Sequence, residues 1–164
     1  MALNLTGMKE NIQTIFEDAN TTTAAHDLSG SLTDRVQRIL KLNPIKIPVQ
    51  PSWYPYVTVY VDSKDINPAD MAATQLQAKR RAEVDFNVVG AVWNSSVLTE
   101  SEDDADDECE ILMENIEEVL RRNQALGSLA LWSFTRSVSY HSLAIDEEAH
   151  LRAGILTLRA TVLY

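Results

Sequence analysis

The stretch SEDDADDECEILMENIEEVLRR, residues 101–122, decides the fold expected from this sequence. Its apolar residues recur every three or four positions, which is the period of one face of an α-helix. The early acids and the final Arg121 and Arg122 complement the helix dipole. We predict one long amphipathic helix with Thr99 and Glu102 as a capping box. Its apolar stripe consists of Ala105, Cys109, Leu112, Ile116 and Val119.

Strand-like segments lie on both sides of this helix, since they are rich in β-branched and aromatic residues or alternate with period two. They are residues 53–61, 83–93, 130–140 and 151–163. In the first, Val57, Val59 and Val61 alternate with Tyr56, Thr58 and Tyr60. In the second, Val84, Phe86, Val88 and Val92 share a face, with Asp85 and Asn87 opposite. In the third, Trp132, Phe134, Val138 and Tyr140 share a face, with Ser133, Thr135, Ser137 and Ser139 opposite.

The N-terminal part predicts two further helices. Residues 6–19 have apolar residues at helical spacing, and Thr6 can cap their start. Residues 32–41 predict a second, shorter helix with Ser31 as N-cap. Four prolines between residues 44 and 55 predict an extended passage along an edge or the surface. Residues 63–81 are expected to form a long connection in which a short helix can begin near Pro68.

The order α-α-β-β-α-β-β predicts an α+β fold. We expect one domain, residues 1–164, with a four-stranded, mainly antiparallel sheet and helices packed on one face. The N-terminus lacks a basic region followed by an apolar run, and no stretch is apolar enough to span a bilayer. These features, with one cysteine, favour a protein made in the cytoplasm and exclude a membrane role.

The net charge of −10 belongs to one segment. Eleven of the 24 acids lie between Glu100 and Glu118, where no Lys or Arg occurs. The rest of the chain is therefore close to neutral. Because nucleic-acid backbones are bound by clustered Lys and Arg, this distribution disfavours sequence-specific nucleic-acid binding.

Residues with catalytic potential are few and scattered. His141 and His150 flank the last hairpin with Asp146 and Glu147 between them, but their spacing matches no metal motif. Cys109 lies in an acidic helix, which raises rather than lowers a thiol pKa, so we interpret it as a core residue. We therefore expect no catalytic, cofactor or metal site, and no enzymatic activity. The alternative is a small ligand-binding or enzymatic domain with its site near His141 and His150.

With the strands placed, the chain resembles the tail terminator proteins of tailed bacteriophages, the family of minor tail protein U. The resemblance rests on Tyr54-Pro55-Tyr56-Val57-Thr58-Val59, on strand 83–93, on the acidic helix 101–122 and on the last two strands. The closing hairpin, with Ser137-Val138-Ser139 and residues 155–162, is the closest part. The resemblance covers nearly the whole chain, although the first 50 residues and residues 63–81 match weakly.

This resemblance implies a structural virion protein of the tail, made in the host cytoplasm. Such proteins form a hexameric ring that ends the polymerisation of the tail tube and presents the head-docking surface. The implied partners are other copies of the chain, the tail tube protein and the head-completion or connector protein. Another head–tail connector, such as a neck or completion protein, is the nearest alternative.

A head-to-tail ring needs two different, complementary faces on each subunit. Lys79, Arg80 and Arg81 form the densest basic run of the sequence. The strongest opposite charge lies at the start of the acidic helix. We therefore expect the basic run of one subunit to lie near the acids of the next, namely Asp103, Asp104, Asp106 and Asp107. The alternative is that both charged runs are only solvated surfaces.

Overall fold

The computed structural model describes residues 3–46, 50–66, 81–94, 101–144 and 150–164. Within these residues, two long helices and five strands follow one another, with two short 3-10 turns, η1 and η2, between the first two strands. The elements are α1 (Leu5–Ala19), β1 (Arg38–Leu40), η1 (Pro44–Lys46), η2 (Pro51–Trp53), β2 (Tyr56–Ile66), β3 (Arg81–Asn94), α3 (Ser101–Arg122), β4 (Trp132–Ala144) and β5 (His150–Leu163).

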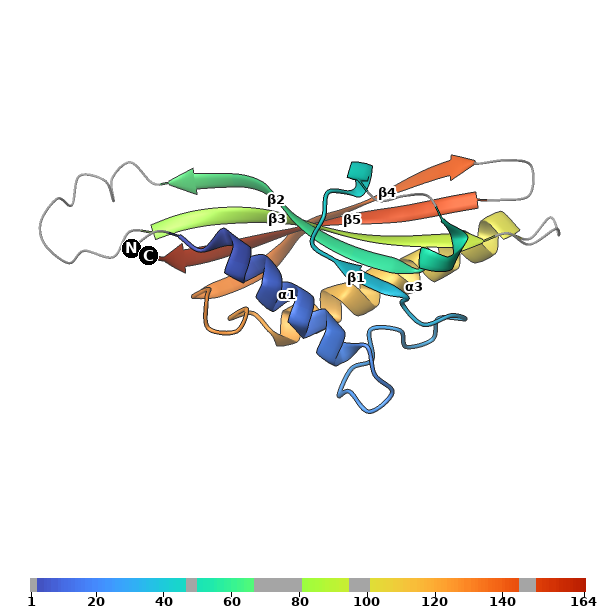
Figure 1. Ribbon diagram of the computed structural model, residues 1–164, viewed down its shortest axis with the longest axis horizontal. Coiled ribbons are helices and arrows are strands. Elements are labelled where there is room, and N and C mark those ends of the chain that lie inside the picture. Colours follow the sequence, from blue (N-terminus) through green and yellow to red (C-terminus); the bar gives the residue numbers. More distant parts are fainter. Residues whose placement is uncertain (1–2, 47–49, 67–80, 95–100, 145–149) are drawn as a thin grey trace, which may run out of the picture.

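The strands form one sheet in the order β1-β2-β3-β5-β4, and both helices lie on the same side of it (Figure 1). Three neighbouring pairs are antiparallel, whereas β1 runs parallel to β2. The α+β class and the single helix-covered face are thus confirmed. The expected count of four strands is wrong, because β1 adds a fifth strand and makes the sheet mixed.

Helix α3 has the bounds and the buried stripe that its sequence predicts. All five stripe residues, from Ala105 to Val119, are at most 2% exposed. The helix packs on β3 and β5, and Met113 lies over the position where Gly90 and Gly154 face each other across the two strands. A Cβ on Gly154 would lie 2.3 Å from Met113 Cγ, so the absence of side chains at this pair lets the helix approach the sheet.

The N-terminal helix is confirmed, with a different cap. Helix α1 buries Met8, Ile12 and Phe16, and Asn4 rather than Thr6 accepts a hydrogen bond from the Gly7 N–H. Thr6 is already inside the helix, so its predicted role as cap is wrong. For the helix 101–122, the predicted capping residue Thr99 lies outside the described residues.

The predicted helix 32–41 is wrong. Residues 33–37 are irregular, and Arg38–Leu40 form β1 against Tyr56–Thr58 of β2. The Val36 N–H donates to Ser29 Oγ at 2.9 Å, and the Thr33 N–H donates to Glu108 of α3 at 2.9 Å. These bonds to distant residues replace the bonds that a helix would make within itself.

The predicted sharing of faces holds for β3 and is wrong for β4. In β3, Val84, Phe86 and Val88 face the helices, with Asp85 and Asn87 on the other face. In β4 a bulge at Arg136 breaks the alternation between Thr135 and Ser137. As a result Val138 and Tyr140 face the helices, while Trp132 and Phe134 lie on the open face, the sheet surface that the helices leave uncovered.

The open face carries a second apolar cluster at one side of the sheet. Tyr54, Tyr56 and Ala91 are buried there against Trp53 and Trp93. The Tyr54 and Tyr56 rings lie 5.0 Å apart. The expected strand 53–61 is shifted along the chain, because residues 53–55 precede β2, which extends to Ile66. The proline-rich passage contains the 3-10 turns η1 and η2 rather than one extended segment, and residues 67–80 of the expected connection lie outside the described residues.

Candidate functional site

The predicted interface residues lie at opposite ends of the sheet. Arg81 is the first residue of β3, and Asp106 forms a 2.7 Å ion pair with Arg152, which lies opposite Val92 near the far end of the same strand. Arg81 and Val92 are eleven positions apart, which corresponds to roughly 35 Å along a strand. The two charged regions therefore cannot neutralise each other within one chain.

For five of the seven predicted residues, the structure either does not describe the side chain or shows it paired within the chain. Arg81 forms a 3.6 Å ion pair with Glu83. Lys79 and Arg80 lie outside the described residues, and nothing is described of the Asp103 side chain. Asp106 is occupied by Arg152 within the chain, so it is a weaker interface candidate than expected. The two acids that stay exposed, Asp104 and Asp107, line a hollow of about 370 Å³ together with Thr33, Asp34, Val92, Trp93 and Glu108.

The two histidines of the alternative site point to opposite faces of the last hairpin. His141 lies opposite Ala153, and His150 lies opposite Ala144, in a ladder without a register shift between these pairs. Ala153 packs in the open-face cluster, so His141 beside it lies on the open face. His150 is three positions before Ala153 on the same strand, and because side chains alternate it lies on the helix-covered face. The structure therefore does not bring His141 and His150 together, while Asp146 and Glu147 lie outside the described residues.

No group of three or more His, Cys, Asp or Glu residues that could hold a metal occurs in the described segments. Cys109 is fully buried in the α3 stripe, and burial raises the pKa of its thiol to about 12. The thiol is therefore protonated at neutral pH, in agreement with its interpretation as a core residue. No helix within the described ranges is long and apolar enough to cross a membrane.

A network of ion pairs lies across the open face. Asp85, whose side chain is 7% exposed, accepts hydrogen bonds from Arg159 Nε at 2.7 Å and Nη2 at 2.8 Å, and from Arg136 Nη1 at 2.9 Å. Arg159 also contacts Glu83 at 3.0 Å. The Arg159 bonds hold the pKa of Asp85 below its usual value, against the opposing effect of burial. This network joins β3, β5 and β4, and it engages Arg136 at the bulge.

Strand β4 is the edge of the sheet that carries most exposed apolar surface. It pairs with β5 on one side and with no described strand on the other. Leu131, Trp132, Phe134 and Tyr140, all on β4 or next to it, are between 39% and 56% exposed. The Trp132 and Phe134 rings stack at 5.0 Å. Exposed aromatic pairs of this kind are enriched at protein–protein interfaces.

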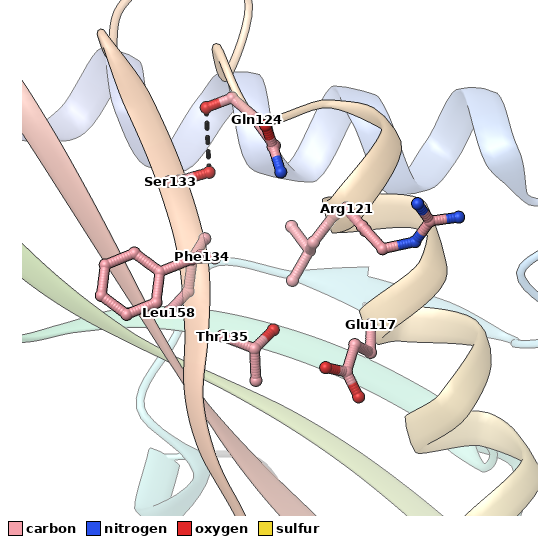
Figure 2. Close-up of a pocket in the computed structure, with 8 residues that line it drawn as sticks. Glu117, Arg121, Gln124, Ser133, Phe134, Thr135 and Leu158 are labelled. Atoms are coloured by element: carbon pink, nitrogen blue, oxygen red, sulfur yellow. Dashed lines mark hydrogen bonds between the residues drawn. The ribbon is translucent and has the colours of Figure 1, made fainter.

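Between β4 and α3 lies a groove of about 220 Å³ (Figure 2). Thr135 points across it toward Glu117, while the Phe134 ring lies on the far side of the strand. Ser133 closes one end by donating to the Gln124 carbonyl at 2.9 Å. The groove thus places hydroxyl and carboxylate groups beside an unpaired strand edge.

Sequence reasoning missed this combination of edge, groove and ion-pair network. The signals were present, because Asp85 and Arg159 occupy polar positions in otherwise apolar strands and Arg136 is the one charged residue of β4. Their meaning depends on which strands are neighbours, and this follows only from the register.

Comparisons with known proteins return fold likenesses only. No protein-family model matches the chain, and no curated protein matches it. A chain of the virion of a native gene transfer agent particle is 11% identical, with 93% of this chain and 94% of that chain covered and a TM-score of 0.46. The type 4 fimbrial biogenesis protein PilO from Pseudomonas aeruginosa is 7% identical, with 98% and 70% covered and a TM-score of 0.28. At these values neither likeness carries a functional argument.

Proposed function

We propose that this protein is a subunit of a ring at the end of a phage-type tail tube, where it stops tube polymerisation and provides the surface that docks to the head. The proposal starts from the resemblance of the strands and the acidic helix to the tail terminator family. It is a structural role without catalysis or cofactor.

The observation that carries the proposal is the separation of opposite charges along the sheet. Arg81 lies at one end, directly after Lys79 and Arg80 in the sequence, and the exposed Asp104 and Asp107 lie at the other. Complementary charges at opposite ends favour head-to-tail contacts between copies, and such contacts make a ring when the rotation closes. Charges at an interface rim contribute more to register and association rate than to affinity.

Charge reversal tests this arrangement. Arg80→Glu with Arg81→Glu is expected to slow ring assembly at low salt, and added salt is expected to shrink the difference from the native protein. Asp104→Lys with Asp107→Lys on the same chain is expected to restore assembly in part, and Asp103→Lys with Asp106→Lys less, because Asp106 is engaged by Arg152. Ring assembly that is indifferent to all these changes at low salt would refute the charge contact.

The nearest competing function is another head–tail connector. Electron microscopy separates the two, because a terminator copurifies with headless tails whereas a head-closure protein stays with heads. The other alternative, a ligand-binding or enzymatic site near His141 and His150, is weakened by their positions on opposite faces of the hairpin.

A further inference from the structure

We propose that the free edge of β4 binds an extended segment of another protein in which Lys or Arg occupies every second position. This inference is independent of the proposed ring. It concerns a different surface and a partner other than a second copy of this chain.

The edge is long, and its one protecting feature is the bulge at Arg136. Natural edge strands are protected by Lys, Pro, inward-pointing charges or bulges. Strand β4, WSFTRSVSYHSLA, has thirteen residues, no Pro or Lys, and a single charged residue. That residue, Arg136, is engaged by Asp85 on the open face. Beyond the bulge at Arg136, residues 137–144 pair with β5 on one side and with no described strand on the other, and they offer a row of backbone groups to an incoming strand.

The chemistry of the partner follows from the helix beside this edge. Glu110, Glu114 and Glu117 are exposed on α3, and none has an ion-pair partner among the described residues. Glu117 lines the groove next to Thr135 of β4, and Glu114 and Glu110 lie on the same side of α3 at the preceding turns. Burial, with a smaller contribution from nearby negative charge, raises the pKa of Tyr140 on β4. The row of acids thus runs along the helix-facing side of β4.

The spacing of the acids fits alternate residues of a strand. Glu110 and Glu117 are seven residues apart, or roughly 10 Å along the helix. Three alternate strand residues span roughly 13 Å, a difference that flexible lysine side chains can cover. A strand added to β4 would therefore present every second side chain to the three carboxylates.

A second copy of this chain does not meet these requirements. Pairing two β4 edges would bring the two acidic rows together on the same face of the joined sheet, and like charges that face each other are unfavourable. The other edge of the sheet, β1, is only three residues long. The occupant is therefore a basic extended segment from a different protein.

The test uses the whole protein and a fluorescent nine-residue peptide in which threonine and lysine alternate. The control peptide has the same composition with its lysines consecutive. Fluorescence anisotropy at low salt is expected to give binding about tenfold tighter for the alternating peptide, which corresponds to about 1.4 kcal/mol. Hydrogen–deuterium exchange is expected to slow at β4 backbone amides only when this peptide is bound.

Matched variants distinguish binding at the β4 edge from nonspecific attraction by the net charge of the protein. Glu110→Gln with Glu114→Gln and Glu117→Gln is expected to weaken binding about tenfold. The control Glu17→Gln with Asp18→Asn and Asp65→Asn, at three exposed acids away from β4, changes the net charge equally and should leave binding within about twofold. Equal binding of the two peptides, equal effects of the two variants, or unchanged exchange at β4 would overturn the proposal. A dimer that protects β4 without peptide would also overturn it, because a second copy would then be the occupant.

Discussion

Asp85 on β3 and Arg159 on β5 form two hydrogen bonds, of 2.7 and 2.8 Å, at directly opposite positions of the sheet. Arg136, at the bulge of β4, adds a third bond to the same carboxylate. One nearly buried acid thereby holds two arginines from two strands, and it links the sheet centre to the edge at which we place partner binding.

Replacing this acid should destabilise the fold strongly. Asp85→Asn weakens the charge-assisted hydrogen bonds that this carboxylate accepts from Arg159 and Arg136, whose side chains are 22% and 45% exposed, and should cost about 1.5–3 kcal/mol. Urea unfolding measures the loss. The control Glu10→Gln removes an exposed pair with Lys41 and should cost less than about 1 kcal/mol. Equal, small losses for both variants would contradict the structural role of Asp85.

Asp85 and a second carboxylate, Glu118, predict how the stability of the fold depends on pH. Hydrogen bonds from Arg159 lower the pKa of Asp85 from its usual 3.8, and those from Arg121 and Arg122 lower the pKa of Glu118 to about 2. Because these folded-state pKa values lie below the unfolded ones, the contribution is complete above about pH 5 and is lost as pH falls toward 2. Melting temperatures from pH 7 to 2 should drop within this window, and less steeply for Asp85→Asn. If the melting temperature of Asp85→Asn fell as steeply as that of the native protein, Asp85 would not contribute to the pH dependence of stability.

The stripe of α3 predicts a large effect at Leu112, which is fully buried. Leu112→Ala should cost about 2–5 kcal/mol in urea unfolding, since it removes packed apolar volume between the helix and the sheet. Leu131→Ala is the control, because Leu131 is 56% exposed and should change stability by less than about 1 kcal/mol. A loss well under 1 kcal/mol at Leu112 would place the stripe outside the core.

The glycine pair under α3 predicts a coupled effect. Gly154→Ala should destabilise by about 1–3 kcal/mol, because its Cβ would meet Met113 Cγ at 2.3 Å. In a Met113→Ala background the same change should cost much less. A double-mutant cycle measures this coupling, and additive effects would mean that the two side chains do not compete for the same space.

Sequence patterns predicted the elements whose own residues decide their structure. The helix 101–122 is correct to its last residue, because one continuous stripe meets one sheet face. The helix 32–41 is wrong although Leu32, Val36 and Ile39 have helical spacing. Val36 is buried in the core, and Leu32 and Ile39 pack against it, but the pairing of β1 with β2 depends on residues eighteen positions away.

The candidate surfaces show the same division. The acidic segment 100–118, the basic run 79–81 and the role of Cys109 as a core residue could all be predicted directly from the sequence. The role of β4 could not, because the bulge at Arg136 exchanges the faces of the residues on either side of it. A bulge of this kind is favoured by a partner on another strand, here Asp85, and no periodicity within β4 indicates it.

The most direct test of the proposed function is tail length. The purified protein would be added to a terminator-deficient phage lysate, and the tails would be measured by electron microscopy. The account predicts that overlong or heterogeneous tails in the untreated lysate are replaced by tails of one length with a ring at the head-proximal end. Tails whose length distribution is the same with and without the protein would contradict it.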